Sequence, residues 1–323
     1  MEFFKYKHPL NFMGNSKIAM FISITLILAS YIILATKGLN YGIDFAGGTI
    51  VQVKYDKPAP IDAMRKKLAT KEIFANASIT EFGSPNEVII RMKTSSASVT
   101  KDIGDVTRNA LAGTGNFEIR RVDIVGPKVG SELKEKGLMA LLLSIASILI
   151  YVAFRFEWRF AVASIAALIH DVSIAMGAVA LFSIDVNLDV LAAILTLLGY
   201  SLNDTIIVFD RIREGIVKSK QTDLAPIINE SITRTLARTT LTSLTTFFVV
   251  FTLFFFGGEI IHAFAFTLLV GIVVGTYSSI FVASPILMLF GFDVKNYHTK
   301  LAEKAKREAE KERMRAQYES GVM

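Results

Sequence analysis

The chain has 323 residues, enough for one large or two ordinary domains. Hydrophobic residues make up 52% of it, Phe is abundant (24) and Pro scarce (7), as expected for long apolar helices rather than a soluble protein. The net charge of +6 does not by itself indicate nucleic-acid binding. Cysteine is absent, which excludes disulfides, thiolate metal sites and a cysteine nucleophile.

Six apolar stretches are long enough to cross a bilayer, which takes about 20 helical residues. The first, 17–36, follows several lysines, so a signal peptide is an alternative reading. Its apolar core of about 19 residues is longer than the roughly 7–15 of a signal peptide, and we therefore expect an uncleaved anchor. The other five are expected at about 138–154, 160–184, 190–210, 237–257 and 263–291, within a second membrane segment of 138–292.

The placement of Lys and Arg predicts the orientation of these spans. Basic residues occur in the N-terminal segment 1–16, after the second and fourth spans, and in the tail 293–323. The short loops 183–189 and 257–260 contain neither Lys nor Arg. We therefore expect a multi-pass protein of the bacterial cytoplasmic (inner) membrane with both termini cytoplasmic. The tail is expected to be a charged helix, either solvated or in contact with lipid, ribosomal RNA or a partner; its mixed charges favour no nucleic-acid site.

Residues 37–137 form the one large segment expected outside the membrane. Strand patterns occur at 47–55, 77–83, 86–93 and 116–126, and helical patterns at 59–70 and 97–113. This order, β-α-β-β-α-β, is that of a ferredoxin-like unit. The predicted fold is thus an α-helical membrane protein of six transmembrane helices with a small α+β external domain between the first two. The domain shows no metal-ligand or nucleophile–base spacing, so we interpret it as a binding or gripping module.

Ionisable residues inside the spans are costly, and they usually face a protein interior or a water path. Three positions are of this kind: His170–Asp171 in the third span, Asn203–Asp204 in the fourth and Arg238 in the fifth. At about 1.5 Å per residue, Asp204 lies roughly 22 Å from the outer face and Arg238 roughly 28 Å, and Asp171 is near the middle. Asp204 and Arg238 therefore share the inner half of the membrane.

These depths suggest that Asp204 and Arg238 form a proton-controlled pair, because protonation of the acid would release the arginine. The polar residues Asn203, Thr205 and Thr242 would support it, with His170 and Asp171 as further supporting groups. Other interpretations remain open at this point. Ser201 or Thr205 could satisfy a structural Asp204, Arg238 could extend to the membrane surface, and His170–Asp171 could be a fixed packing pair.

Asp44, Gly47 and Gly48 lie in "IDFAGG", where the first span passes into the first predicted strand. Glycine permits a positive φ or a close approach of two backbones. The segment is either a structural joint or a joint that transmits membrane motion to the external domain.

Five stretches occur in order along the chain: "GIDFAGGT" (42–49), "VGPKVGSEL" (125–133), "GYSLNDTIIVFDRIRE" (199–214), "RTLARTTLTSLTT" (234–246) and "FGGEIIHAFAFTLLVGIVVGTYSSIFVASP" (256–285). Together they resemble the SecF branch of the SecDF family of bacterial protein-export subunits, and the third stretch is the most specific. The resemblance covers nearly the whole chain.

The resemblance implies a subunit that pairs with SecD into a twelve-span unit of the resistance–nodulation–division type. Such a unit uses the proton-motive force to draw unfolded preproteins out of the SecYEG channel; YajC, SecA and membrane lipid are further expected partners. It implies that Asp204 is the family's membrane Asp and Arg238 its membrane Arg, and that a second proton-path Asp belongs to SecD. No cofactor, metal, nucleic acid or enzymatic activity is implied.

Two other functions are alternatives to this one. Half of a proton-coupled efflux permease would share the membrane architecture, but such pumps usually carry larger external domains in a chain of twice as many spans. An intramembrane protease would need a Gly-x-Gly-Asp, Gly-x-Ser or His-Glu-x-x-His motif, and none is present; a Walker A sequence is also absent. A single carboxylate favours a proton as the coupling ion, and sodium stays an alternative.

Overall fold

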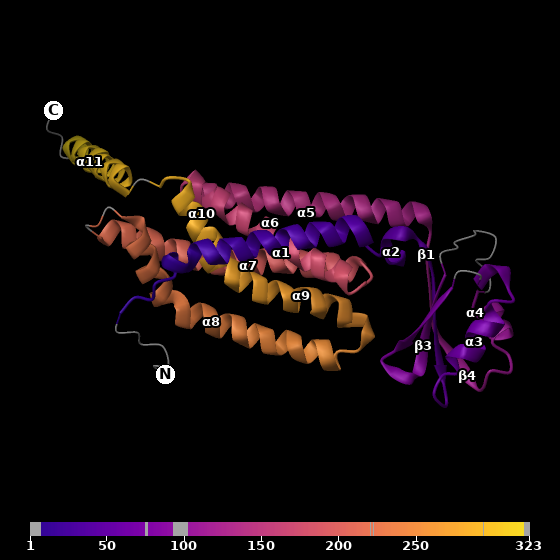
Figure 1. Cartoon of the computed structure of the whole chain (residues 1–323). Coiled ribbons are helices and arrows are strands. Elements are labelled where there is room, and N and C mark those ends of the chain that lie inside the picture. Colours follow the sequence, from indigo (N-terminus) through magenta and orange to yellow (C-terminus); the bar gives the residue numbers. More distant parts are fainter. Residues whose placement is uncertain are drawn as a thin grey trace.

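The computed structural model describes residues 8–74, 77–92, 103–219, 221, 223–292 and 294–319. A bundle of long helices makes up most of the molecule, and a small domain built on a four-stranded sheet lies at one end of it (Figure 1). We call this end the sheet-side end. At the opposite end of the bundle, α1 (Ser16–Lys37) begins and α10 (Ser284–Leu289) is followed by α11 (Val294–Glu319) (Figure 1).

The six predicted membrane helices are confirmed in number, since six helices of the described chain are long and apolar enough to cross a membrane. They are α1 (Ser16–Lys37), α5 (Pro127–Arg155), α6 (Trp158–Leu181), α7 (Leu188–Lys218), α8 (Leu224–Phe256) and α9 (Glu259–Ser278), the last continued by a π-helical turn (Ser279–Ala283) and α10 (Ser284–Leu289).

Several helices are longer than the apolar stretches predicted. α7 has 31 residues, which is about 46 Å of helix against a hydrocarbon core of about 30 Å. The extra turns are helical, but they are polar, so a prediction from apolar stretches does not include them. The tail is helical as well, as α11 (Val294–Glu319).

The small domain has the predicted ferredoxin-like order. Its elements are β1 (Gly48–Tyr55), α3 (Ile61–Leu68), β2 (Ser78–Phe82), β3 (Ser84–Met92), α4 (Ile103–Ala110) and β4 (Phe117–Val125). The strands lie in the order β2-β3-β1-β4 and each pair is antiparallel. The helix expected over 97–113 is present from Ile103, and residues 97–102 lie outside the described ranges.

Strand alternation gives this sheet two different faces, because successive side chains point to opposite sides. Val51, Val53, Val88 and Ile90 are fully buried on the face that α3 and α4 cover, away from the bundle (Figure 1). The alternate residues of the same strands, which except for the buried Ile89 are polar or only partly buried, line the side that faces the bundle. No helix of the sheet domain covers this second face among the described residues.

The bundle packs around α6 and α7, whose buried side chains dominate its core. Phe160 and Phe209 are almost completely buried and meet edge to face, with ring centroids 5.0 Å apart. α1 packs closely on α6 at Gly177, where an added Cβ would lie 2.8 Å from the Cα of Ser30. Such small-residue contacts are typical of packed membrane helices.

Candidate functional site

Asp204 lies in the interior of the bundle, fully shielded from solvent. Its Oδ2 accepts a hydrogen bond of 3.2 Å from Ser243 Oγ on α8, and Ser243 Oγ accepts one of 2.8 Å from Thr276 Oγ1 on α9. Its Oδ1 has no hydrogen-bond partner among the described residues. Burying an ionised carboxylate costs far more than burying a protonated one. Asp204 is therefore a buried carboxyl that links α7 to α8 directly and to α9 through Ser243.

A second buried carboxylate, Asp171 on α6, joins α6, α7 and α9. Its Oδ2 accepts hydrogen bonds from Ser201 Oγ (2.5 Å) and Ser278 Oγ (2.8 Å). Its Oδ1 lies 2.8 Å from His170 Nδ1, and the His170 ring stacks on Tyr277. Asp171 is fully buried and His170 is 2% exposed. We call His170, Asp171, Ser201 and Ser278 the Asp171 cluster.

The Asp171 cluster lies about one helical turn from Asp204. Ser201 and Asp204 are three residues apart on α7, which is about 4.5 Å along the helix axis. Gly275 permits this packing, because a Cβ there would lie 3.1 Å from Ser201 Cβ and 3.5 Å from Asp171 Oδ2. The next residue is Thr276, which contacts Ser243. Asp171 on α6 and Asp204 on α7 thus both lie where α7 packs on α9, about one helical turn apart.

The structure does not bring Arg238 to Asp204. Arg238 is exposed on α8 and forms no ion pair within the part of the chain described. Asn203 and Thr242 are also exposed. Thr205 is buried, and its hydroxyl donates to the Ser201 carbonyl rather than to Asp204. The expectation of a direct Asp204–Arg238 pair within this chain is therefore wrong for this conformation, and so is the alternative that Ser201 or Thr205 satisfies Asp204.

Helical rotation explains the difference. Arg238 lies only five residues before Ser243 on α8, but five residues are about 140° of rotation around the helix. Thr235, Thr239 and Ser243 form the buried stripe of α8, and Arg238 points elsewhere. The sequence did contain a signal for the true partners of the buried acids. Ser243, Thr276 and Ser278 belong to serine- and threonine-rich stretches of helices that face each other.

Asp44 lies in a short helix, α2 (Ile43–Ala46), and contacts the beginning of α7. Its Oδ2 accepts a hydrogen bond of 3.1 Å from the backbone N–H of Leu188, the first residue of α7. A carboxylate is favoured at a helix N-terminus because free N–H groups and the helix dipole point toward it. Asp44 thus connects the exit of α1 to the helix that carries Asp204.

Gly47 and Gly48 are required by the backbone. Both have positive φ, +74° and +143°. A Cβ on Gly47 would lie 2.9 Å from Pro127 Cα at the start of α5, and one on Gly48 would lie 2.5 Å from the Met92 carbonyl oxygen. The two glycines let β1, the end of β3 and the start of α5 approach closely. This close packing favours a structural joint over a joint that transmits membrane motion to the sheet domain.

Replacing Asp171 by Ala should lower the stability of the bundle. The change removes three buried contacts, of which only that of Ser278 has an alternative acceptor among the described residues, the Gly275 carbonyl, and each buried group left unpaired costs about 1–3 kcal/mol. We expect a markedly lower midpoint of thermal unfolding for the purified full chain in detergent. Ser173→Ala is the matched control on the same helix, because Ser173 makes one hydrogen bond, to Tyr31. Equal midpoints for the two variants would contradict the role of the Asp171 cluster.

Known proteins resemble this chain over its whole length. The family model "Protein export membrane protein SecD/SecF, C-terminal" matches residues 106–293, and the model of the SecD/SecF GG motif matches residues 32–59. A protein translocase subunit SecF from Helicobacter pylori (strain J99) is 47% identical over 99% of both chains. One from Vibrio alginolyticus is 45% identical over 94% of this chain and 96% of its own.

Solved structures of SecDF also resemble this chain. SecDF from Thermus thermophilus, described as a translocon-associated membrane protein, has a TM-score of 0.80 and 35% identity over 90% of this chain. SecDF in a super-membrane-facing form has a TM-score of 0.66 and 34% identity over 94% of this chain. This chain spans only 39% and 40% of those two chains. Sequence, fold and the glycine motif lead to one conclusion: the chain is a multi-pass membrane protein that belongs to the SecF family of protein translocase subunits.

Proposed function

We propose that this chain pairs with a SecD protein and uses the proton-motive force to promote late translocation and release of preproteins from SecYEG. It would act without ATP hydrolysis, in the inner membrane with both termini cytoplasmic. In this proposal Asp204 carries the transported proton, with Asn203, Thr205 and Thr242 lining its path. The observation that carries the proposal is the exposure of Arg238 and Asn203 on helices that cross the membrane, beside a buried acid.

An exposed Arg in a membrane span is costly unless another protein or water covers it. Arg238, Asn203, Thr242 and Thr245 are all exposed on α7 and α8 of the single chain. Thr242 and Ser243 are adjacent in sequence, so the exposed polar side of α8 begins next to the hydrogen bond to Asp204. A partner helix that covers this side would reach both Arg238 and the neighbourhood of Asp204. The solved SecDF chain, of which this chain matches 39%, has ample length to supply such helices.

Selective collapse of ion gradients tests the proposal and the identity of the coupling ion. In vesicles that contain the full chain with SecD and SecYEG, a protonophore should reduce preprotein release to the rate seen without this chain. A sodium ionophore should leave the rate unchanged, because a single buried carboxylate suits a proton. The opposite pattern would replace the proton by sodium, and no effect of either would contradict gradient coupling.

A further inference from the structure

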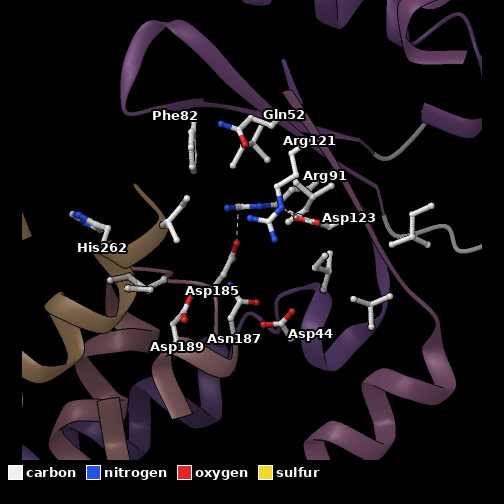
Figure 2. Close-up of a pocket in the computed structure, with 18 of the residues that line it drawn as sticks. Asp44, Gln52, Phe82, Arg91, Arg121, Asp123, Asp185, Asn187, Asp189 and His262 are labelled. Atoms are coloured by element: carbon white, nitrogen blue, oxygen red, sulfur yellow. Dashed lines mark hydrogen bonds and ion pairs between the residues drawn. The ribbon is translucent and has the colours of Figure 1, made fainter. Parts of the chain in front are cut away.

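A cleft of about 600 Å³ lies between the open face of the sheet and the sheet-side end of the bundle (Figure 2). Its volume is within the range of about 300–1,000 Å³ that is typical of ligand sites. The sheet domain supplies one wall from all four strands. The other wall comes from α2, the loop between α6 and α7, and the first residues of α7 and α9.

The sheet wall has a regular pattern that follows from strand pairing. Ile50 on β1 lies between Arg91 of β3 and Asp123 of β4, and in the next row of the same face Gln52 lies between Ile89 and Arg121. Apolar, amide and charged side chains therefore alternate across the wall. Phe82 and Ile124 add further apolar surface.

The opposite wall is acidic. Asp44, Asp185 and Asp189 lie on the bundle side of the cleft, and Asp185 reaches across to Arg91 (Figure 2). One ion pair joins the two walls, from Arg91 to Asp185 at 2.6 Å, and both side chains are about one-third or less exposed. Arg121 is already paired with Asp123 on the sheet wall.

The charges of the cleft do not balance. Its lining holds four Asp and two Arg, and each Arg is paired with one Asp. Asp44 and Asp189 have no Lys or Arg partner among the described residues. The cleft thus combines apolar surface, neutral hydrogen-bonding groups such as Gln52, and two carboxylates without a basic partner in the described part of the chain; Asp44 also accepts a hydrogen bond from the Leu188 N–H.

We propose that this cleft binds an extended polypeptide segment that carries a basic residue. The isoleucines and Phe82 accept apolar side chains of varied shape, and Asp44 and Asp189 attract a Lys or Arg side chain. The side-chain oxygens of Gln52, whose amide nitrogen already donates to Glu87, and of Asn187 accept hydrogen bonds from backbone N–H groups. The inference rests on the proposed function, in which the substrate is unfolded polypeptide. It assigns that substrate a site formed jointly by the sheet domain and the membrane helices.

Photo-crosslinking tests the site without any ion gradient. A photoreactive residue is introduced at Gln52 in the full chain, held in detergent or nanodiscs, and offered an unstructured fluorescent peptide of Gly, Ser, Leu and Lys. The control is the same residue at Lys66, which is exposed on α3 on the far side of the sheet. Crosslinking should be strong at Gln52 and weak at Lys66. Equal crosslinking at the two positions would overturn the proposal.

Charge is tested separately. A peptide with Glu in place of Lys should crosslink less, and Asp189→Asn should weaken binding of the Lys peptide about 1.4- to fivefold, the effect of a partly exposed ion pair of ~0.2–1 kcal/mol. High salt should reduce the difference between the peptides. Identical binding of both peptides would overturn the choice of a basic segment.

A blocking experiment covers the case in which the photoreactive residue disturbs folding. The chain has no cysteine, so Gln52→Cys or Lys66→Cys provides a single reactive thiol that is modified after folding. A bulky maleimide on Gln52→Cys should prevent peptide binding, and one on Lys66→Cys should not. Peptide binding that survives the block refutes the cleft. If peptide binds but the gradient experiments fail, the site stands and the proposed coupling does not.

Discussion

Asp204→Asn is expected to abolish the proton-driven part of preprotein release while the bundle stays folded. The carbonyl oxygen of Asn has the same size and can accept the Ser243 hydrogen bond, but the amide cannot take up or release a proton. One charge moved through 100 mV provides ~2.3 kcal/mol, a bias of about fifty-fold between two conformations. Initial rates of release in reconstituted vesicles, with and without a proton gradient, should therefore become equal.

The matched control for Asp204 is Asp210→Asn on the same helix. Asp210 is partly exposed and pairs with Arg155 and Arg213 near the end of α7. Exposed ion pairs contribute little, about 0–1 kcal/mol, so this variant should keep its gradient response. Asp204→Glu retains a carboxyl group and should restore part of the response. A full response in Asp204→Asn would show that the proton is carried elsewhere.

Gly48→Ala is expected to destabilise the joint between α1, the sheet domain and α5. Its φ of +143° is a conformation that an L-residue rarely adopts, and the new Cβ would lie 2.5 Å from the Met92 carbonyl oxygen. Backbone strain of this kind costs about 1–3 kcal/mol, and the steric contact adds to it. Thermal unfolding and the yield of folded full chain should both fall.

Gly126→Ala provides the comparison for Gly48. Gly126 precedes α5, has a φ of −66°, and no atom lies within 4 Å of the position its Cβ would occupy. This variant should be as stable as the parent chain. Equal stability of Gly48→Ala and Gly126→Ala would refute the structural explanation of the glycine pair and favour a role in motion.

Much of the fold was predictable because it depends on local pattern. The alternation in "GGTIVQVKY" predicts β1 to within one residue, and the β-α-β-β-α-β order predicts the antiparallel sheet. The number of membrane helices follows from apolar length. The ends of these helices could not be predicted from apolar length, because the polar turns of α7 near Lys218 and of α8 near Leu224 lie beyond the apolar stretches.

For the candidate site, the sequence identified Asp204 as a buried acid but did not reveal the directions of the side chains around it. Asp204 is in the bundle interior as expected, but its partner is Ser243 rather than Arg238, because a side chain's direction depends on rotation as well as on distance along the helix. The cleft could not be predicted at all. Arg91 and Asp185 are 94 residues apart in the chain and meet only because the open face of the sheet lies against the sheet-side end of the bundle.

The continuity of α7 has a mechanical consequence. One uninterrupted helix runs from Asp189 in the cleft to Asp204 in the membrane, a distance of fifteen residues or about 22 Å. A tilt of about 10° around Asp204 would displace Asp189 by about 4 Å, since a helix moves as a stiff rod over this length. Asp44, bonded to the first turn, and Asp185, in the loop just before it, would be carried along. A small rearrangement at the buried acid would thus widen or narrow a cleft on the far side of the hydrocarbon core.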